Sequence, residues 1–164
     1  MVDQGDFVLF LMKGTEPAYP AYPQLTAPEG VRLDLGGSVA LDHGGSLSAD
    51  GPNEPPPLGA GPRQPGLNPV VWVDAARLSA HLLVRPAMPG DRMRPLGMQG
   101  HRKLSDIFNS LRIPTDARRR WPVVLSGDTV VWLTGLRMGH EVRMTEATGR
   151  AVQLRFEIPE GAQR

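Results

Sequence analysis

The chain has 164 residues and a net charge of +1, with 19 glycines, 17 prolines and no cysteine. The lack of cysteine excludes disulfides, thiolate zinc sites and thiol nucleophiles, and it fits a reducing cytoplasm, the predicted location. No apolar run approaches the roughly 20 residues that span a bilayer, so no membrane contact is expected, and the 40% hydrophobic content predicts a compact β-rich part.

Residues 1–69 are predicted to form a Pro/Gly-rich leader with a few short strands. Phe7–Met12 is an apolar run typical of a short buried strand, and Val31–Leu35 alternates as a half-buried strand does. A Gly-Gly turn follows, which predicts that Val39–Leu41 is its hairpin partner. Residues 44–69 are dominated by Gly, Pro, Ser and Asn, so a flexible loop is expected there.

Regular structure is expected to return in a domain over residues 70–158, followed by a tail over 159–164. Val70–Val73 and Leu82–Val84 are apolar enough to predict buried strands. Asp74 lies between them, where its carboxylate can cap a single helical turn, Ala75 to Ser79.

Two short helices are predicted in the middle of this domain. The stronger signal covers residues 102–112, where four apolar residues recur at helical spacing and therefore share one face. Pro114 can start a second helix, which carries Arg118–Arg120 and stops before Pro122. The four apolar residues are Leu104, Ile107, Phe108 and Leu111.

Strands are predicted again after the helices. Val123–Leu125 and Val130–Leu133 form a hairpin around Ser126-Gly127-Asp128, and Val152–Phe156 closes the domain as an alternating strand. Trp72 and Trp132 lie in apolar strands and are expected in the core, whereas Trp121 is expected to pack behind the second helix. The predicted fold class is α+β, mostly β, with sandwich-like mixed sheets and two short helices.

Positive charge is concentrated in one segment of the chain. Residues 1–84 carry four basic and nine acidic groups, whereas residues 85–120 carry nine basic and three acidic groups. A polyanion is bound by local positive charge, and arginine forks suit phosphate oxygens. The segment therefore predicts an RNA-backbone contact, with these candidate residues: Arg92, Arg94, Arg102, Lys103, Arg112, Arg118 and Arg119.

The same segment resembles the carboxy-terminal domain of tRNA(Ile)-lysidine synthases. The likeness covers roughly residues 70–157 and consists of several motifs in a fixed order, which makes it more specific than any single motif. The motifs are Pro89-Gly90-Asp91-Arg92, Pro95-Leu96-Gly97-Met98, Gly100-x-Arg102-Lys103-Leu104-Ser105-Asp106-x-Phe108, Ile113-Pro114 with Arg118 and Pro122, and Val130–Leu133 with Gly135 and Arg137.

The resemblance implies a fold like that of a domain in the phenylalanyl-tRNA synthetase β subunit, and a role in gripping tRNA(Ile). The family's enzyme is an ATP-dependent ligase that attaches lysine to the wobble cytidine of this tRNA. Its chemistry belongs to an amino-terminal PP-loop domain that uses ATP and Mg²⁺. That catalytic domain is the second partner that the resemblance implies.

The chain departs from the family pattern at several points. Arg102-Lys103 stands where the family has paired lysines, and Thr115 stands where a basic residue is common. The phosphate loop Ser-Gly-Gly-x-Asp-Ser does not occur, and Leu125–Asp128 echoes it only as a hairpin turn. We therefore expect no ATP binding by the family's route, no catalytic residue and no cofactor in this chain.

Other interpretations of the basic residues stay open. Arg92 and Arg94 would, in the simplest case, neutralise Asp91 and nearby loop carbonyls, and Arg118–Arg120 would form a solvated face of which at most two members meet one RNA surface. A second functional hypothesis is a protein-interaction or dimerisation module that docks on the catalytic half or on a second copy. The histidines are scattered, so no metal site is predicted.

Overall fold

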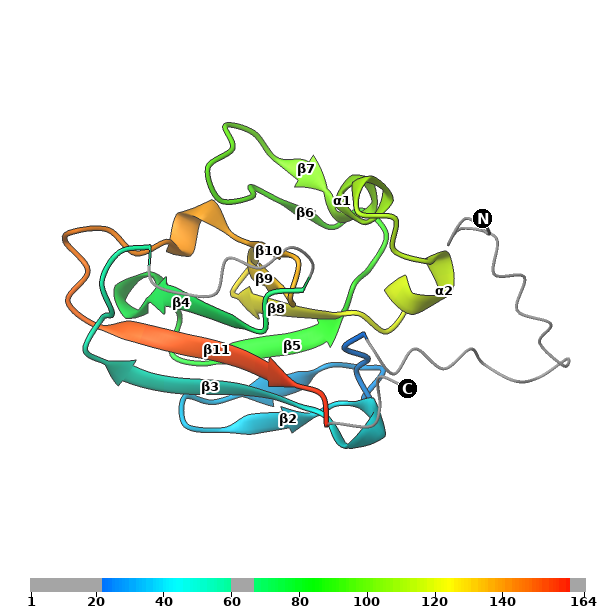
Figure 1. The fold of residues 1–164 in the computed structure, drawn as a ribbon, viewed down its shortest axis with the longest axis horizontal. Coiled ribbons are helices and arrows are strands. Elements are labelled where there is room, and N and C mark those ends of the chain that lie inside the picture. Colours follow the sequence, from blue (N-terminus) through cyan, green and yellow to red (C-terminus); the bar gives the residue numbers. More distant parts are fainter. Residues whose placement is uncertain (1–21, 60–66, 160–164) are drawn as a thin grey trace, which may run out of the picture.

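The computed structural model describes residues 22–59 and 67–159, which form two packed β-sheets with a third, smaller layer on top (Figure 1). The strand predicted over Phe7–Met12 lies outside these residues. Neighbouring strands pair antiparallel throughout the described part. The predicted class, mostly β with sandwich-like sheets and two short helices, is confirmed.

The elements fall into three groups. The five-stranded sheet has the order β1 (Val31–Leu33), β5 (Leu82–Pro86), β8 (Pro122–Ser126), β9 (Thr129–Leu133) and β10 (Arg137–Met138). The four-stranded sheet has the order β2 (Ser38–Ala40), β3 (Ser46–Asn53), β11 (Ala151–Glu157) and β4 (Val70–Asp74). The small layer holds β6 (Arg92–Met93), β7 (Arg102–Lys103), α1 (Leu104–Ser110) and α2 (Thr115–Arg118), while short 3₁₀ turns lie at Asp42–Gly44 (η1), Ala75–Arg77 (η2) and His140–Val142 (η3).

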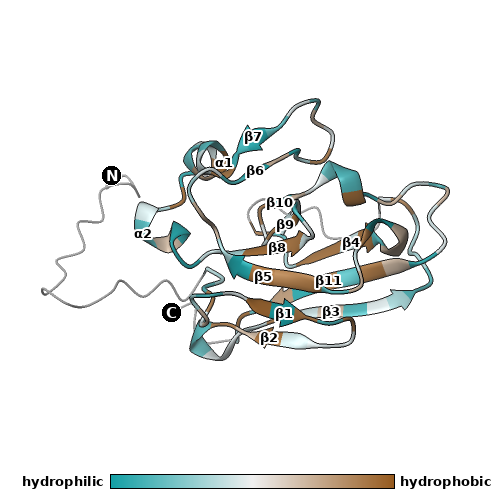
Figure 2. Ribbon diagram, turned by 180° about the vertical axis from the view of Figure 1, so that it is seen from behind, coloured by the Kyte–Doolittle hydropathy of each residue, from teal (hydrophilic) through white to brown (hydrophobic). Residues whose placement is uncertain are grey.

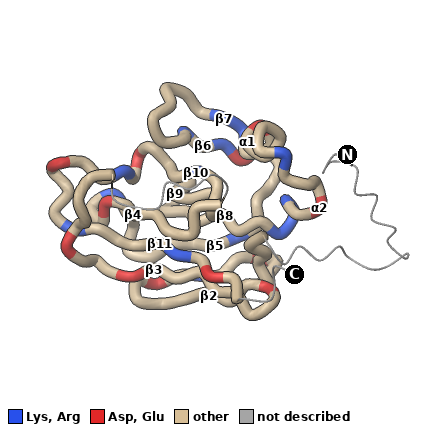
Figure 3. Tube along the Cα trace, viewed as in Figure 1, with Lys and Arg blue, Asp and Glu red and all other residues tan. Residues whose placement is uncertain are grey.

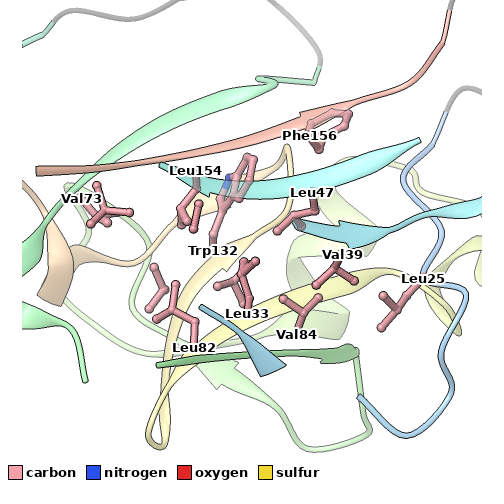
Figure 4. Packing of buried hydrophobic residues seen from close by; sticks show 14 of the residues in the cluster. Leu25, Leu33, Val39, Leu47, Val73, Leu82, Val84, Trp132, Leu154 and Phe156 are labelled. Carbon is pink, nitrogen blue, oxygen red and sulfur yellow. The ribbon is translucent and has the colours of Figure 1, made fainter. Parts of the chain in front are cut away.

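The larger core lies between the two main sheets. Trp132 from β9 packs against Phe156 from β11 with ring centroids 6.0 Å apart, and Leu47 from β3 joins them (Figure 4). Figure 2 shows hydrophobic residues along the strands of this sandwich, in contrast to the hydrophilic β7.

A second core lies on the opposite face of the five-stranded sheet. Here Val123 and Leu133 meet the apolar face of α1, and Trp121 is fully buried with its indole N–H donating to the carbonyl of Thr134 at 2.9 Å. The predicted position of Trp121 behind the helices is confirmed. Because β8 is covered on both faces, all five of its residues are buried, which explains its nearly continuous apolar sequence.

The flexible loop predicted over residues 44–69 is wrong for its first part. Residues 46–53 form β3, an eight-residue strand hydrogen-bonded between β2 and β11. Leu47 and Ala49 alternate into the core, while small polar residues occupy the other face. The composition indicates a loop, but the alternation fits a strand whose backbone donors and acceptors are satisfied on both sides.

The hairpin predicted for Val31–Leu35 and Val39–Leu41 is also wrong. β1 pairs with β5 and β2 pairs with β3, so the Gly36–Gly37 turn carries the chain from one main sheet to the other. Gly36 has a φ of +86°, and its N–H donates to the carbonyl of Ala49 at 2.7 Å. Both strands thus face one core from opposite layers.

Strands on both sides of residue 69 share this core. Leu25, Leu33 and Val39 pack in one cluster with Val73, Val84 and later residues. Residues 22–53 are therefore part of the sandwich, not a leader that precedes it.

Other predicted elements agree with the structure. The carboxylate of Asp74 accepts from the N–H of Ala76 at 2.9 Å, although the turn it caps ends at Arg77. β8 and β9 form the predicted hairpin, with Ser126 opposite Thr129 at the turn. Among the described helices, none is long and apolar enough to cross a membrane.

We predict that Leu47→Ala lowers the free energy of unfolding by about 3 kcal/mol, because it opens a cavity in the core. Ser48→Ala, on the other face of β3, should change it by less than about 0.5 kcal/mol. Urea denaturation of both variants tests this. Equal small effects would mean that residues 46–53 do not form a core strand.

Candidate nucleic-acid interface

The small layer over residues 85–120, called here the basic layer, is built around a two-stranded ribbon. In β6 and β7, Arg92 lies opposite Lys103 and Met93 lies opposite Arg102. Met93 is buried in the second core, so it anchors the ribbon, while Arg92 and Lys103 are exposed. Like charges directly opposite on paired strands repel, so this pair presents concentrated positive charge to solvent.

Arg102 and Lys103 were predicted on a helix, and this is wrong. The helix α1 begins only at Leu104, because the two preceding residues pair with β6 as strand β7. The apolar face is otherwise as predicted: Leu104, Ile107 and Phe108 are buried. The strand conformation brings Lys103 beside Arg92, eleven positions away in sequence, which a helix would not do.

An ion pair holds the base of the ribbon. Arg85 donates from Nη1 and Nη2 to the two carboxylate oxygens of Asp91 at 2.8 and 2.9 Å, and the N–H of Met88 adds a third hydrogen bond at 2.8 Å. The main-chain carbonyl of Asp91 accepts from the N–H of Leu104 at 2.9 Å. Asp91 thus connects the end of β5, the ribbon and the start of α1.

The pKa of Asp91 lies below its ordinary value. Desolvation would raise this pKa, but the hydrogen bonds from Arg85 and from the Met88 N–H outweigh it. The carboxylate of Asp91 is therefore neutralised by Arg85, and not by Arg92 or Arg94 as the simplest interpretation had it.

The segment that joins α1 to α2 is the next part of the candidate interface. The N–H of Arg112 donates to Asn109 and the N–H of Ile113 donates to Phe108, at 3.1 and 3.0 Å, which is the hydrogen-bond pattern of a Schellman motif. Glycine is preferred at the left-handed position of this motif, but here Arg112 occupies it with a φ of +56°. Its side chain is exposed.

Arg118 has an internal role. Its Nε and Nη2 donate to the carbonyl of Ile113 at 2.8 and 2.6 Å, its Nη1 donates to Asn109 Oδ1 at 2.8 Å, and the guanidinium lies 5.5 Å from the ring centroid of Phe108. Desolvation lowers its pKa. Arg118 remains a predicted RNA contact, but most of its donors already close the turn between the helices.

The remaining basic side chains of this layer fall into two groups, those that bond to other groups of the fold and those that do not. Arg94 Nε donates to the carbonyl of Met98 at 2.8 Å, and Arg120 binds Asp42 and the carbonyl of Leu25. In contrast, five cations of the basic layer make no side-chain hydrogen bond or ion pair with the part of the chain that the structure describes. They are Arg92, Arg102, Lys103, Arg112 and Arg119.

The loop after β6 is fixed against β10 and η3. His140 Nδ1 accepts from the N–H of Gly97 at 3.2 Å, and the N–H of His140 donates to the carbonyl of Arg94 at 2.8 Å. Desolvation and the guanidiniums of Arg143 and Arg94 lower the pKa of His140, against an opposing effect of Glu141. Sequence spacing gave no sign of this contact, because its two sides lie far apart in the chain.

Positive charge gathers on the basic layer. Figure 3 shows Lys and Arg on the ribbon and around the helices, whereas both signs of charge are mixed over the two main sheets, where β2 carries no charged residue and β11 carries Arg155 as well as Glu157. Among residues 22–59 and 67–159, no group of three or more His, Asp or Glu side chains is placed to hold a metal ion.

The chain is similar to a known protein family and to several of its members. The family model "TilS substrate C-terminal domain" matches residues 82–156. The tRNA(Ile)-lysidine synthase of Symbiobacterium thermophilum is 41% identical over 93 residues, which are 56% of this chain and 19% of that protein. The corresponding protein of Geobacter sulfurreducens is 35% identical over 113 residues, 69% of this chain and 23% of that protein.

A solved structure, described as "Crystal structure of TILS C-terminal domain", matches with a TM-score of 0.63 and 28% identity, covering 80% of this chain and 99% of that chain. This coverage extends beyond residues 70–158, so the likeness includes strands before residue 69. The chain spans about a fifth of the length of the curated relatives it matches.

We predict that Asp91→Asn lowers the free energy of unfolding at neutral pH by about 2 kcal/mol, because it breaks a largely buried charged pair. The native contribution is present above the unfolded pKa of about 3.9 and is lost as pH falls through the lower folded pKa. Unfolding measured between pH 7 and pH 3 should therefore show a smaller pH dependence in the variant. Asp34→Asn, which affects an exposed pair with Arg32, is the control and should have little effect. An equal loss in both would contradict the anchoring role.

Proposed function

Because the chain belongs to the TilS substrate C-terminal domain family, we propose that it binds and positions tRNA(Ile) for a tRNA(Ile)-lysidine synthase. The proposed surface is the basic layer. Ligation of lysine to the wobble cytidine, with ATP and Mg²⁺, is assigned to a PP-loop catalytic domain, and the place of action to the cytoplasm. In this proposal the described residues hold the substrate and do no chemistry.

The observation that carries the proposal is that five cations gathered in the basic layer have no side-chain partner among the described residues. Arg92 and Lys103 lie side by side on an anchored ribbon, and Arg112 keeps a strained backbone conformation. Repulsion and strain both cost stability, and a phosphate backbone is the partner that offsets them. Cations that hold the fold together, such as Arg85 and Arg118, are already neutralised or hydrogen-bonded.

Such a surface contacts phosphates and sugars more than base edges. The deep major groove of an A-form helix is closed to side chains, so double-stranded RNA is bound mainly by its shape. Contacts of this kind fix orientation and carry little sequence information. The domain would thus orient the tRNA body, and leave identification of the anticodon to the catalytic domain.

A second candidate is a docking or dimerisation module. It is favoured by three exposed apolar side chains on the loops beside the ribbon, Met88, Leu96 and Met98. Sedimentation with and without tRNA separates the candidates. A stable dimer that ignores tRNA would favour docking.

The main test is a tRNA-binding titration at several salt concentrations. If about four phosphates are neutralised, the slope of log K against log salt is roughly −3 to −4. The double variant Arg92→Glu with Lys103→Glu should weaken binding at least tenfold and reduce the slope by about 2. The control is Arg32→Glu with Arg155→Glu, on exposed strand positions outside the basic layer. A slope near zero for the unaltered chain, or equal losses in both double variants, would rule out this interface.

Arg112 gives a test in which stability and binding move in opposite directions. Arg112→Gly should raise the free energy of unfolding by roughly 0.5–1 kcal/mol, because relief of the left-handed strain exceeds the added chain entropy of glycine. It should also weaken tRNA binding severalfold and reduce the salt slope by about 1. Arg112→Lys keeps both the charge and the strain, so it should change neither quantity much. Unimpaired tRNA binding by the glycine variant would remove Arg112 from the interface.

A further inference from the structure

A pocket of about 470 Å³ lies beside the basic layer and has no part in the interface described above. It opens between the edge strand β4, the loop after β6 and the segment that follows β9. The residues that line it include Trp72, Leu96, Arg137, Met138, Arg143 and Met144. A volume of this size is in the range of sites for small organic ligands.

The walls are joined by backbone contacts. The N–H of Leu96 donates to the carbonyl of Met138 at 2.9 Å, and Val73, next to Trp72, forms an isolated bridge with Arg143. Three segments far apart in sequence are thus held together by the fold. These contacts join three of the segments that line the pocket, and Leu58, Gly59 and Asn68 add to the lining.

One wall is aromatic. β4 is the last strand of its sheet, and alternation turns Val73 into the core and Trp72 away from it. Trp72 is only half-buried, whereas Trp121 and Trp132 are 0% exposed. The prediction that Trp72 is a core residue is therefore wrong. Trp72 shares the pocket lining with Met138 and Met144, and a partly exposed indole is a surface on which a flat ring can stack.

The rim is cationic. Arg137 is exposed and Arg143 half-buried on the pocket wall. Each also donates from Nη1 to a nearby main-chain carbonyl, Arg137 to Leu136 at 2.7 Å and Arg143 to His140 at 2.9 Å. Arg143 and Arg94 both lower the pKa of the neighbouring His140, which agrees with a positive potential on this side. In the wall, the buried Oδ1 of Asn68 has no hydrogen-bond donor among the described residues.

We infer that this pocket holds one unpaired nucleotide of the tRNA that the basic layer binds. Its base stacks on Trp72, and its phosphate lies against Arg137 and Arg143. A base that stacks on a side chain needs a free face, which a base inside a double helix does not offer, so the nucleotide comes from a single-stranded part of the RNA. This inference rests on the proposed function, and the loop of Leu96 and Arg94 joins the pocket to the ribbon.

The three tryptophans make the site measurable. Because two of them are fully buried, quenching by acrylamide reports mainly on Trp72. An adenosine trinucleotide should quench the fluorescence of the chain and protect it from acrylamide, and a blunt RNA hairpin should not. Trp72→Phe should abolish the response to the trinucleotide. Failure of the trinucleotide to perturb Trp72 at millimolar concentration would overturn the inference.

Charge variants separate this site from the basic layer. Arg137→Glu should weaken the trinucleotide about tenfold, whereas the matched control Arg150→Glu, exposed and not among the residues that line the pocket, should have no effect. Arg92→Glu with Lys103→Glu should weaken tRNA and leave the trinucleotide response unchanged.

The two proposals can therefore fail independently. Binding of tRNA without any change in Trp72 would overturn the pocket alone. Quenching by the trinucleotide without binding of tRNA would leave the pocket and remove the proposed function. A response of Trp72 to an apolar tripeptide, with none to the trinucleotide, would identify a peptide site and overturn the nucleotide.

Discussion

The fold depends on one constraint, which is that the hairpin β8–β9 is buried on both of its faces. Val124 and Trp132 point into the sandwich, while Val123 and Leu133 point into the core beneath α1. The five-stranded sheet is therefore a middle layer, held from both sides. The ribbon and helices rest on it through Met93 and Phe108, so the position of the cations follows from the packing of apolar side chains beneath them.

Local patterns in the sequence predicted those elements whose partners are close along the chain. The face formed by Leu104, Ile107 and Phe108 follows from helical periodicity, and the β8–β9 hairpin follows from two apolar runs around a short turn. β3 was missed because Ser, Gly and Asp dominate its composition, although Leu47 and Ala49 alternate. The pairing of β1 with β5 spans about fifty residues of sequence, and no local rule contains that information.

The candidate site shows the same division. The composition predicted the positive net charge of residues 85–120. It did not predict which of these cations bond to other groups of the fold and which stay exposed. Arg94 and Arg118 satisfy carbonyls of their own chain, whereas Arg92 and Lys103 became neighbours only because β6 and β7 pair. The pocket could not be predicted from the sequence, for a further reason. Trp72, Leu96 and Arg137 occupy three separate segments, and each has an ordinary structural explanation when taken alone.

The contacts of Asp91 have a mechanical consequence. Through its side chain and its carbonyl it fixes the end of β5, the ribbon and the first turn of α1 to one another. The backbone positions that carry Arg92 and Lys103 are therefore held opposite each other in the ribbon. In the proposed function, little backbone entropy would be lost when a ligand binds there, and only the two long side chains would have to adjust to the spacing of its phosphates.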